Sequence, residues 1–148
     1  MLTEKSAGAV IFRKEKNVIR YLLLHYFYKS EYWDFCKGNI EQKENPEDTA
    51  KREIKEETGL EKIEIIPGFQ EKTTWFYKRD KENVLKEVTY FLVETKVKEI
   101  KISKEHIGYG WFSFGEAMEK MRFKNNKEIL KKANDFLAKR GGLGKFLG

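Results

Sequence analysis

The alternation of hydrophobic and polar positions predicts a chain of strands interrupted by one helix and ended by two more helices. Residues 7–13 (AGAVIFR) and 18–27 (VIRYLLLHYF) form two predicted strands, joined by a turn at 15–17. The continuous apolar run 21–24 within the second strand predicts burial on both faces. Residues 32–37 alternate around Asp34 as a short strand would.

After the first predicted helix, the pattern predicts strands again as far as residue 112, and helices after that. The predicted strands are 63–67, 69–78, 84–95 with a hairpin turn at 79–83, and a short strand within 107–112. Ser113 and Glu116 form a capping-box pattern that begins a helix over 113–121. Another helix is predicted over about 125–139, with Ile129, Leu130, Ala133 and Leu137 on its buried face. The glycine-rich stretch 141–148 is predicted to be a flexible tail. This order favours an α+β fold with a mixed sheet flanked by helices.

The first predicted helix carries clear start and stop signals. Asn45 is a favourable N-cap and Pro46 fits the first helical position, where its missing N–H is not needed. Gly59 is the natural residue just beyond the end of the helix. The sequence therefore predicts a helix from about residue 45 to residue 58.

Three glutamates at the end of this helix share one side. Glu53, Glu56 and Glu57 stand at i, i+3 and i+4, where like charges repel by roughly 0.2–0.5 kcal/mol per pair. Clustered carboxylate oxygens suit a hard divalent cation such as Mg²⁺ or Mn²⁺. A solvated acidic face beside the neighbouring cations is the other interpretation, and the spacing alone leaves both open.

The segment from Gly38 to Leu60 resembles the signature of the Nudix family. Its pattern is G-x5-E-x7-R-E-U-x-E-E-x-G-U, where U is a bulky aliphatic residue, and every specified position is filled without a gap. The resemblance implies an α/β/α sandwich in which the segment forms a loop, a helix and a loop beside the sheet. It also implies hydrolysis of a nucleoside diphosphate linked to another group, with Mg²⁺ or Mn²⁺ as cofactor.

The resemblance also implies roles for single residues. The expected metal ligands are the Gly38 carbonyl and the carboxylates of Glu53, Glu56 and Glu57. The expected general base is Glu57 or Glu53, with Glu105 outside the signature left open, since many family members recruit such a glutamate as a ligand or base. Arg52 is expected to hold the loop through Glu44, because guanidinium groups bind carboxylates with two hydrogen bonds.

Looser similarities along most of the chain resemble the family members that hydrolyse diadenosine tetraphosphate to ATP and AMP. They include the run 33–38 (WDFCKG), in which Cys36 stands where that group usually has proline. Base–aromatic stacking is worth roughly 1–3 kcal/mol per base, and the resemblance points to Trp75 and Tyr109 as the stacking pair, although aromatic residues on strands are equally often core. Lys37 and His106 are the expected phosphate contacts, and His106 is alternatively a residue that orders its loop.

Composition narrows the setting of this chemistry. With 148 residues and no linker, residues 1–148 are expected to form one domain. The net charge of +6 suits a polyphosphate substrate, and 24 interspersed acidic residues argue against a stable nucleic-acid partner. The single cysteine, Cys36, is expected to be a buried apolar residue, which fits a cytoplasmic protein. No apolar run suggests a membrane span, and either a monomer or a homodimer is expected.

Two other functions remain compatible with the sequence. An oxidised nucleoside triphosphate or the 5′ end of an RNA is cleaved by other Nudix enzymes. A nucleotide-binding regulator without catalysis is a third reading, against which the complete set of glutamates argues.

Overall fold

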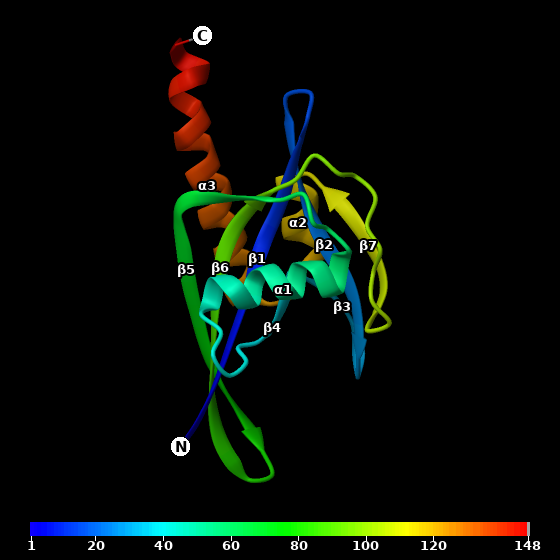
Figure 1. Cartoon of the computed structure of the whole chain (residues 1–148), viewed down its shortest axis with the longest axis vertical. Coiled ribbons are helices and arrows are strands. Elements are labelled where there is room, and N and C mark those ends of the chain that lie inside the picture. The colour runs from blue at the N-terminus through cyan, green and yellow to red at the C-terminus, as the bar shows by residue number, and fades with distance from the viewer. Residues whose placement is uncertain (148) are drawn as a thin grey trace.

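The structure is a computed structural model that describes the backbone of residues 1–147 and the side chains of residues 1–140. Its elements follow the predicted order, from strands through one helix to two terminal helices (Figure 1). In chain order they are β1 (Leu2–Glu15), β2 (Val18–Tyr28), β3 (Ser30–Asp34), β4 (Cys36–Asn39), α1 (Pro46–Thr58), β5 (Glu64–Arg79), β6 (Glu82–Glu94), β7 (His106–Phe112), α2 (Phe114–Lys120) and α3 (Lys124–Leu147).

All seven strands belong to one mixed sheet. The strand order is β3-β2-β1-β6-β5, with β4 also paired to β1 and β7 also paired to β2. The central pair β1–β6 is parallel, from Leu2 opposite Val84 to Phe12 opposite Glu94, and the other pairs are antiparallel. This confirms the mixed sheet expected from the sequence.

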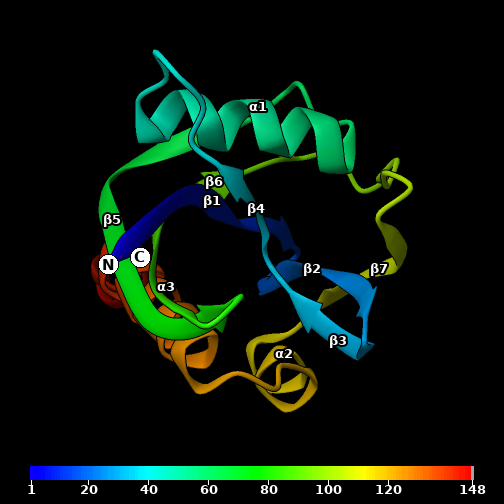
Figure 2. The same cartoon turned by 90° about the horizontal axis from the view of Figure 1, so that it is seen from below.

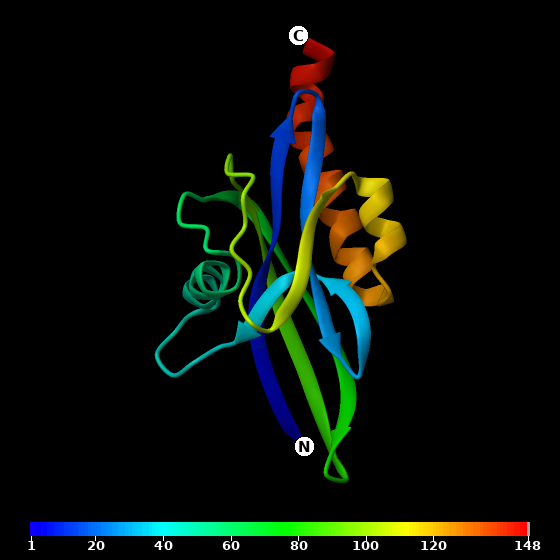
Figure 3. The same ribbon diagram turned by 90° about the vertical axis from the view of Figure 1, so that its right-hand side faces the viewer.

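The helices cover both faces of the sheet. Helix α1 lies on one face and helices α2 and α3 lie on the other, as Figures 2 and 3 show from two directions. Two core clusters fill the spaces between these layers: the α1-side cluster contains Leu22, Leu24 and Ile54, and the α3-side cluster contains Leu23, Tyr90 and Leu130. The apolar run 21–24 contributes to both clusters, so its predicted burial on both faces is confirmed.

Helix α1 begins and ends as its sequence predicts. The Asn45 side chain accepts a hydrogen bond of 2.8 Å from the backbone N–H of Asp48. Gly59 adopts φ 74°, a left-handed conformation that glycine adopts without strain, and its N–H closes the helix on the Lys55 carbonyl. The predicted capping box of Ser113 and Glu116 is also present at the start of α2.

Several boundaries differ from those expected. The predicted strand 7–13 is longer in the structure, where β1 runs from Leu2 to Glu15. The predicted strands 63–67 and 69–78 are one strand, β5, because the chain passes an irregularity at Gly68 (φ 93°) and resumes its pairing with β6. The predicted strand 32–37 is divided into β3 and β4, which pair with different partners. Helix α3 continues to Leu147 rather than ending near 139, so the backbone of residues 141–147 is helical. The expected flexibility of 141–148 stays a prediction, and the side chains of that stretch and Gly148 lie outside the described residues.

No helix within residues 1–147 is both long and apolar enough to span a bilayer.

Candidate active site

Gly38 and Glu53 meet where β4 passes the helix α1. A Cβ atom on residue 38 would lie 1.9 Å from the Glu53 Oε1 atom, far inside van der Waals contact. Only glycine therefore lets the backbone of β4 approach the carboxylate this closely. The structure thus brings together two of the four predicted metal ligands.

Glu57 is buried at the end of α1 and faces the strand junction. Its Oε2 atom accepts a hydrogen bond of 3.1 Å from the Lys37 N–H and one of 3.2 Å from the Cys36 thiol. Its Oε1 atom lies 3.3 Å from the Tyr26 hydroxyl and 3.1 Å from His106 Nε2. The Glu57 carboxylate is therefore fixed by β2, β4 and β7 together. Cys36 is buried, as predicted.

Arg52 connects the loop to the glutamates of α1. Its Nε atom donates to Glu44 Oε2 at 2.7 Å, which is the contact expected from the sequence. Its Nη1 atom lies 2.9 Å from Glu53 Oε1 and 3.2 Å from Glu56 Oε2. The Arg52 hydrogen bond lowers the pKa of Glu44 to about 2. Arg52 thus holds three carboxylates at once.

The charge on Glu53 is disfavoured in this arrangement. Burial raises its pKa, the charge of Glu57 raises it further, and Arg52 only partly offsets both, so that the pKa of Glu53 is about 7. Crowded carboxylates of this kind are relieved by a bound cation.

The donor set fits a hard divalent ion in kind. It consists of carboxylate oxygens and a backbone carbonyl, which are the ligands that Mg²⁺ and Mn²⁺ prefer. Among the described side chains, however, no three acidic, histidine or cysteine groups converge on one point as metal ligands. Arg52 holds Glu53 and Glu56, while Glu57 is turned toward its own donors, so an ion would have to compete for these oxygens.

The Lys37 side chain forms an ion pair with Asp34, three residues earlier in the chain. Its Nζ atom lies 2.8 Å from Asp34 Oδ2, and the Asn126 amide of α3 donates to the other oxygen of Asp34 at 2.9 Å. Burial alone would lower the pKa of Lys37, but the Asp34 carboxylate, together with Tyr90 and Tyr32, outweighs it and the pKa is raised. The ammonium group therefore stays protonated in its ion pair with Asp34, and its phosphate contact stays a prediction.

The loop before β7 places two predicted residues differently. Glu105 is exposed, and its backbone N–H lies 3.4 Å from the Ser103 hydroxyl. His106 is buried and contacts Glu57. The Glu105 carboxylate is thus free to turn toward a ligand, whereas the His106 ring lies inside the protein.

Trp75 and Tyr109 do not form a pair in this structure. Trp75 packs against the α3-side cluster. Tyr109 is opposite Leu24 in the β2–β7 register, and Leu24 belongs to the α1-side cluster. Since directly paired residues of antiparallel strands project to the same face, the two aromatic rings lie on opposite faces of the sheet. Any role of either ring in substrate binding stays a prediction.

An aromatic row that the sequence reading missed begins beside Lys37. The Lys37 ammonium lies 5.8 Å from the centroid of the Tyr26 ring, and the Tyr32 ring stacks on Tyr26 at 5.1 Å and 5°. Phe123 meets Tyr32 edge to face at 5.6 Å, and Arg122 covers both. The register of β2 and β3, which pairs Tyr26 with Tyr32, creates this row, and only a correct hairpin prediction could have found it.

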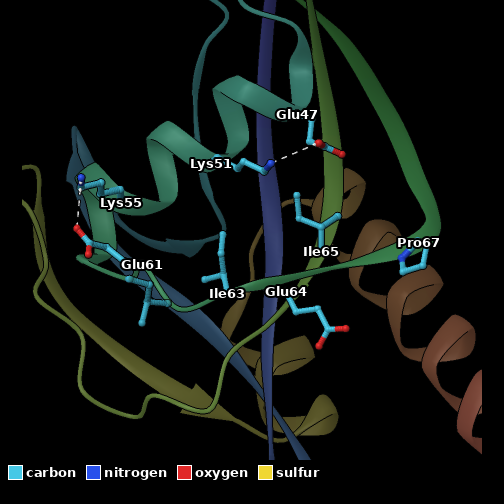
Figure 4. A pocket seen from close by; sticks show the side chains of 9 residues that line it. Glu47, Lys51, Lys55, Glu61, Ile63, Glu64, Ile65 and Pro67 are labelled. Atoms are coloured by element: carbon cyan, nitrogen blue, oxygen red, sulfur yellow. Dashed lines mark ion pairs between the residues drawn. The ribbon is translucent and has the colours of Figure 1, made fainter.

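A separate groove of about 890 Å³ lies between α1 and residues 60–67 (Figure 4). Its walls include Leu60, Ile63 and Ile65. Among its lining residues, Lys51 pairs with Glu47 along α1 at 3.6 Å, and Lys55 pairs with Glu61, beyond the end of the helix, at 3.3 Å. None of the predicted site residues lines it. The groove is therefore distinct from the glutamate cluster.

Comparison with known proteins gives consistent matches along the chain. The family model described as the NUDIX domain matches residues 2–133. The asymmetrical bis(5′-nucleosyl)-tetraphosphatase of Mus musculus is 32% identical over 143 residues, covering 90% of this chain and 95% of that protein. Dihydroneopterin triphosphate diphosphatase of Haemophilus influenzae is 30% identical over 143 residues, covering 86% and 85%. Among solved structures, a binary complex of the C. elegans Ap4A hydrolase has a TM-score of 0.80 and 30% identity, covering 91% of this chain and 98% of that one.

Proposed function

The chain belongs to the Nudix family, and from this premise we propose that it hydrolyses diadenosine tetraphosphate and related dinucleoside polyphosphates. The complete glutamate set packed around Gly38 and Arg52 is the observation that carries a hydrolytic role. The narrower substrate is supported by similarity to the mouse and C. elegans enzymes over about nine-tenths of the chain.

Mg²⁺ or Mn²⁺ is the proposed cofactor. The Gly38 carbonyl and the carboxylates of Glu53, Glu56 and Glu57 would hold it, because they are the hard oxygen donors that the chain gathers at one end of α1. When bound, such an ion neutralises phosphate charge and makes water a better nucleophile. The raised pKa of Glu53 supports a site that is adapted to a cation.

The chain's own residues supply the remaining chemistry of the proposed reaction. Glu53 or Glu57 accepts the proton of the attacking water, with Glu105 as the open third candidate. Water adds to one phosphorus, one P–O bond of the polyphosphate breaks, and diadenosine tetraphosphate yields ATP and AMP. Lys37 balances the charge of the phosphates beside the site, since its ammonium group stays protonated.

The aromatic row of Tyr26, Tyr32 and Phe123 is the proposed binding surface for an adenine base. It begins next to Lys37, so a base stacked there keeps its phosphates near the glutamates. Stacking contributes roughly 1–3 kcal/mol per base. Tyr109, 38% exposed on β7, remains a candidate platform for the second base, and Trp75 is a weaker one because it packs partly into the core.

Product analysis tests this proposal directly. Anion-exchange chromatography after incubation with Mg²⁺ compares diadenosine tetraphosphate with an oxidised dGTP, a 5′-triphosphorylated RNA and dihydroneopterin triphosphate. We expect ATP and AMP from diadenosine tetraphosphate as the fastest reaction. The variant Glu57→Gln serves as the control, and we expect its turnover to fall by at least about a hundredfold because a positioned base contributes roughly 10²–10⁴-fold.

Other outcomes lead to the alternative functions. Faster cleavage of one of the other substrates would keep the hydrolytic site and reject the dinucleotide assignment. The H. influenzae relative makes dihydroneopterin triphosphate the strongest of these competitors. Tight nucleotide binding without cleavage of any substrate would instead indicate a regulatory nucleotide-binding protein.

A further inference from the structure

A row of polar groups runs from the loop before β7 to the buried Glu57 carboxylate. The Glu105 backbone N–H lies 3.4 Å from Ser103 Oγ, and Ser103 Oγ lies 2.9 Å from His106 Nδ1. At the other side of the ring, His106 Nε2 lies 3.1 Å from Glu57 Oε1. The His106 side chain is fully buried, so its two nitrogens have only protein partners.

The hydrogen positions along this row follow from what each group can donate. Ser103 Oγ can accept from the Glu105 N–H and still donate its own hydrogen to His106 Nδ1. A neutral imidazole that accepts at Nδ1 carries its hydrogen on Nε2. This arrangement turns a hydrogen of Nε2, and not a lone pair, toward the Glu57 carboxylate, which can only accept. The Nε2–Oε1 contact is short but too poorly aligned to be a hydrogen bond, and Nε2 has no hydrogen-bond partner among the described residues.

Two groups lie close to Glu57 Oε1, His106 Nε2 and the Tyr26 hydroxyl. The Tyr26 hydroxyl, at 3.3 Å, has one hydrogen and a shorter partner, the Phe35 carbonyl at 2.8 Å. The opposite oxygen, Oε2, takes the donors of Lys37 and Cys36. His106 Nε2, at 3.1 Å, and the Tyr26 hydroxyl, at 3.3 Å, are thus the two groups that limit rotation of the carboxylate on the Oε1 side.

The backbone of β2 is built to hold the His106 ring in place. The β2–β7 pairing shifts register between His25 and Tyr26, which sets His106 opposite Tyr26. The Tyr26 ring meets the His106 ring edge to face at 4.5 Å and 71°. The ring can therefore not swing away from Glu57 without disturbing the end of the sheet.

We propose that His106 is a positioning residue for Glu57, held in its working tautomer by Ser103. This assigns His106 a role inside the protein, in place of the substrate contact that the family resemblance implies. The inference builds on the proposed function in taking Glu57 as part of the hydrolytic site. It also couples the Glu105 loop to Glu57, since Ser103 receives the Glu105 N–H and contacts the His106 ring.

Two amide substitutions separate positioning from general structural support. In His106→Gln the amide NH₂ can reach the place of Nε2, whereas in His106→Asn it reaches only the place of Nδ1. Partners that orient metal ligands typically account for about 10–100-fold in metal affinity or activity. We expect His106→Asn to weaken binding of Mn²⁺ alone by about tenfold or more, measured by electron paramagnetic resonance without substrate, and to lower kcat while KM changes little. His106→Gln should recover most of both.

The matched controls use the second histidine and the serine. His25 stacks on Trp33 away from the glutamates, so His25→Asn should leave Mn²⁺ affinity unchanged. If His106→Asn does not fold, as judged by its near-ultraviolet circular dichroism, Ser103→Ala takes its place, and we expect at least a severalfold weaker Mn²⁺ affinity because the tautomer is released.

Equal behaviour of His106→Gln and His106→Asn, or unchanged Mn²⁺ affinity in His106→Asn and in Ser103→Ala, would overturn the positioning role. If the wild-type protein binds Mn²⁺ but cleaves no dinucleoside polyphosphate, the proposed substrate fails while the Mn²⁺ comparison still decides the role of His106. A wild-type protein that binds no Mn²⁺ would reject both proposals.

Discussion

At the scale of the residue, Arg52 is the cation around which the glutamates are arranged. It holds Glu44 in the loop and reaches Glu53 and Glu56 on α1 with the same guanidinium group. A metal ion bound at the proposed ligands would have to take oxygens that this group already contacts. We therefore expect the metal affinity of the proposed site to depend partly on how readily the glutamates leave Arg52.

The carboxyl of Glu53 gives a pH dependence whose sign can be worked out. Its folded pKa is about 7, above the usual value of about 4.3 for an unfolded chain. Between these values the unfolded state loses its proton first, so the folded state loses stability as pH rises from about 4.5 to 7. In EDTA, we expect Glu53→Gln to lack this loss and to exceed the wild type at pH 8 by roughly 1–2 kcal/mol after allowance for solvent screening.

Denaturant unfolding at pH 5 and pH 8 measures this difference. Glu119→Gln, a substitution of an exposed glutamate on α2, is the control and should leave the stability at both pH values nearly unchanged. A Glu53→Gln protein that is less stable than the wild type at pH 8 would contradict the raised pKa of Glu53 and its assignment to burial and to the charge of Glu57.

At the scale of the element, α1 is the most completely specified part of the fold. Its cap at Asn45, its proline start and its glycine end were all readable from the sequence, and all are present. The strands around it were less readable, because β3 and β4 are separated by a change of partner rather than by a turn signal. Local patterns determine a helix, whereas strand boundaries depend on partners distant in sequence.

Removing the N-cap should weaken α1 without touching the glutamates. Asn45→Ala loses the hydrogen bond to the Asp48 N–H, and the expected cost is about 1 kcal/mol. For a chain of this size that corresponds to a fall of roughly 2–4 °C in Tm. Asn45→Asp keeps the acceptor and should stay close to the wild type in differential scanning calorimetry. An equal loss in both variants would show that the cap hydrogen bond is not the cause.

At the scale of the whole molecule, metal binding and folding should be linked. An ion that binds only the folded protein stabilises it by about 2.7 kcal/mol at a concentration of 100 Kd. We expect Mg²⁺ to raise the Tm of the wild type in a concentration-dependent way and EDTA to reverse it. The double variant Glu53→Gln/Glu56→Gln should show no such shift, with NaCl at matched ionic strength as the control. A Tm shift of equal size in the double variant would show that the ion binds at a site that does not need Glu53 and Glu56.

Sequence reasoning reached the layers of the fold and the composition of the glutamate cluster, but not the aromatic contacts. The glutamates lie within one helix, so their spacing alone places them on one side. Trp75 and Tyr109 lie on different strands, and only the sheet register shows that their side chains project to opposite faces. The row of Tyr26, Tyr32 and Phe123 likewise depends on three elements meeting.

The parallel pairing of β1 with β6 has a consequence for the order in which the chain folds. β4 and α1, which carry the glutamate site, lie in sequence between these two central strands, and β4 is paired directly to β1. A parallel neighbour requires a long crossover, and contacts between distant segments form slowly because a large loop must close first. A nascent chain that has reached only Leu60 has its signature complete in sequence but lacks β6, the strand that completes the centre of the sheet. We therefore expect the site to reach its final packing late in folding, after β6 docks beside β1.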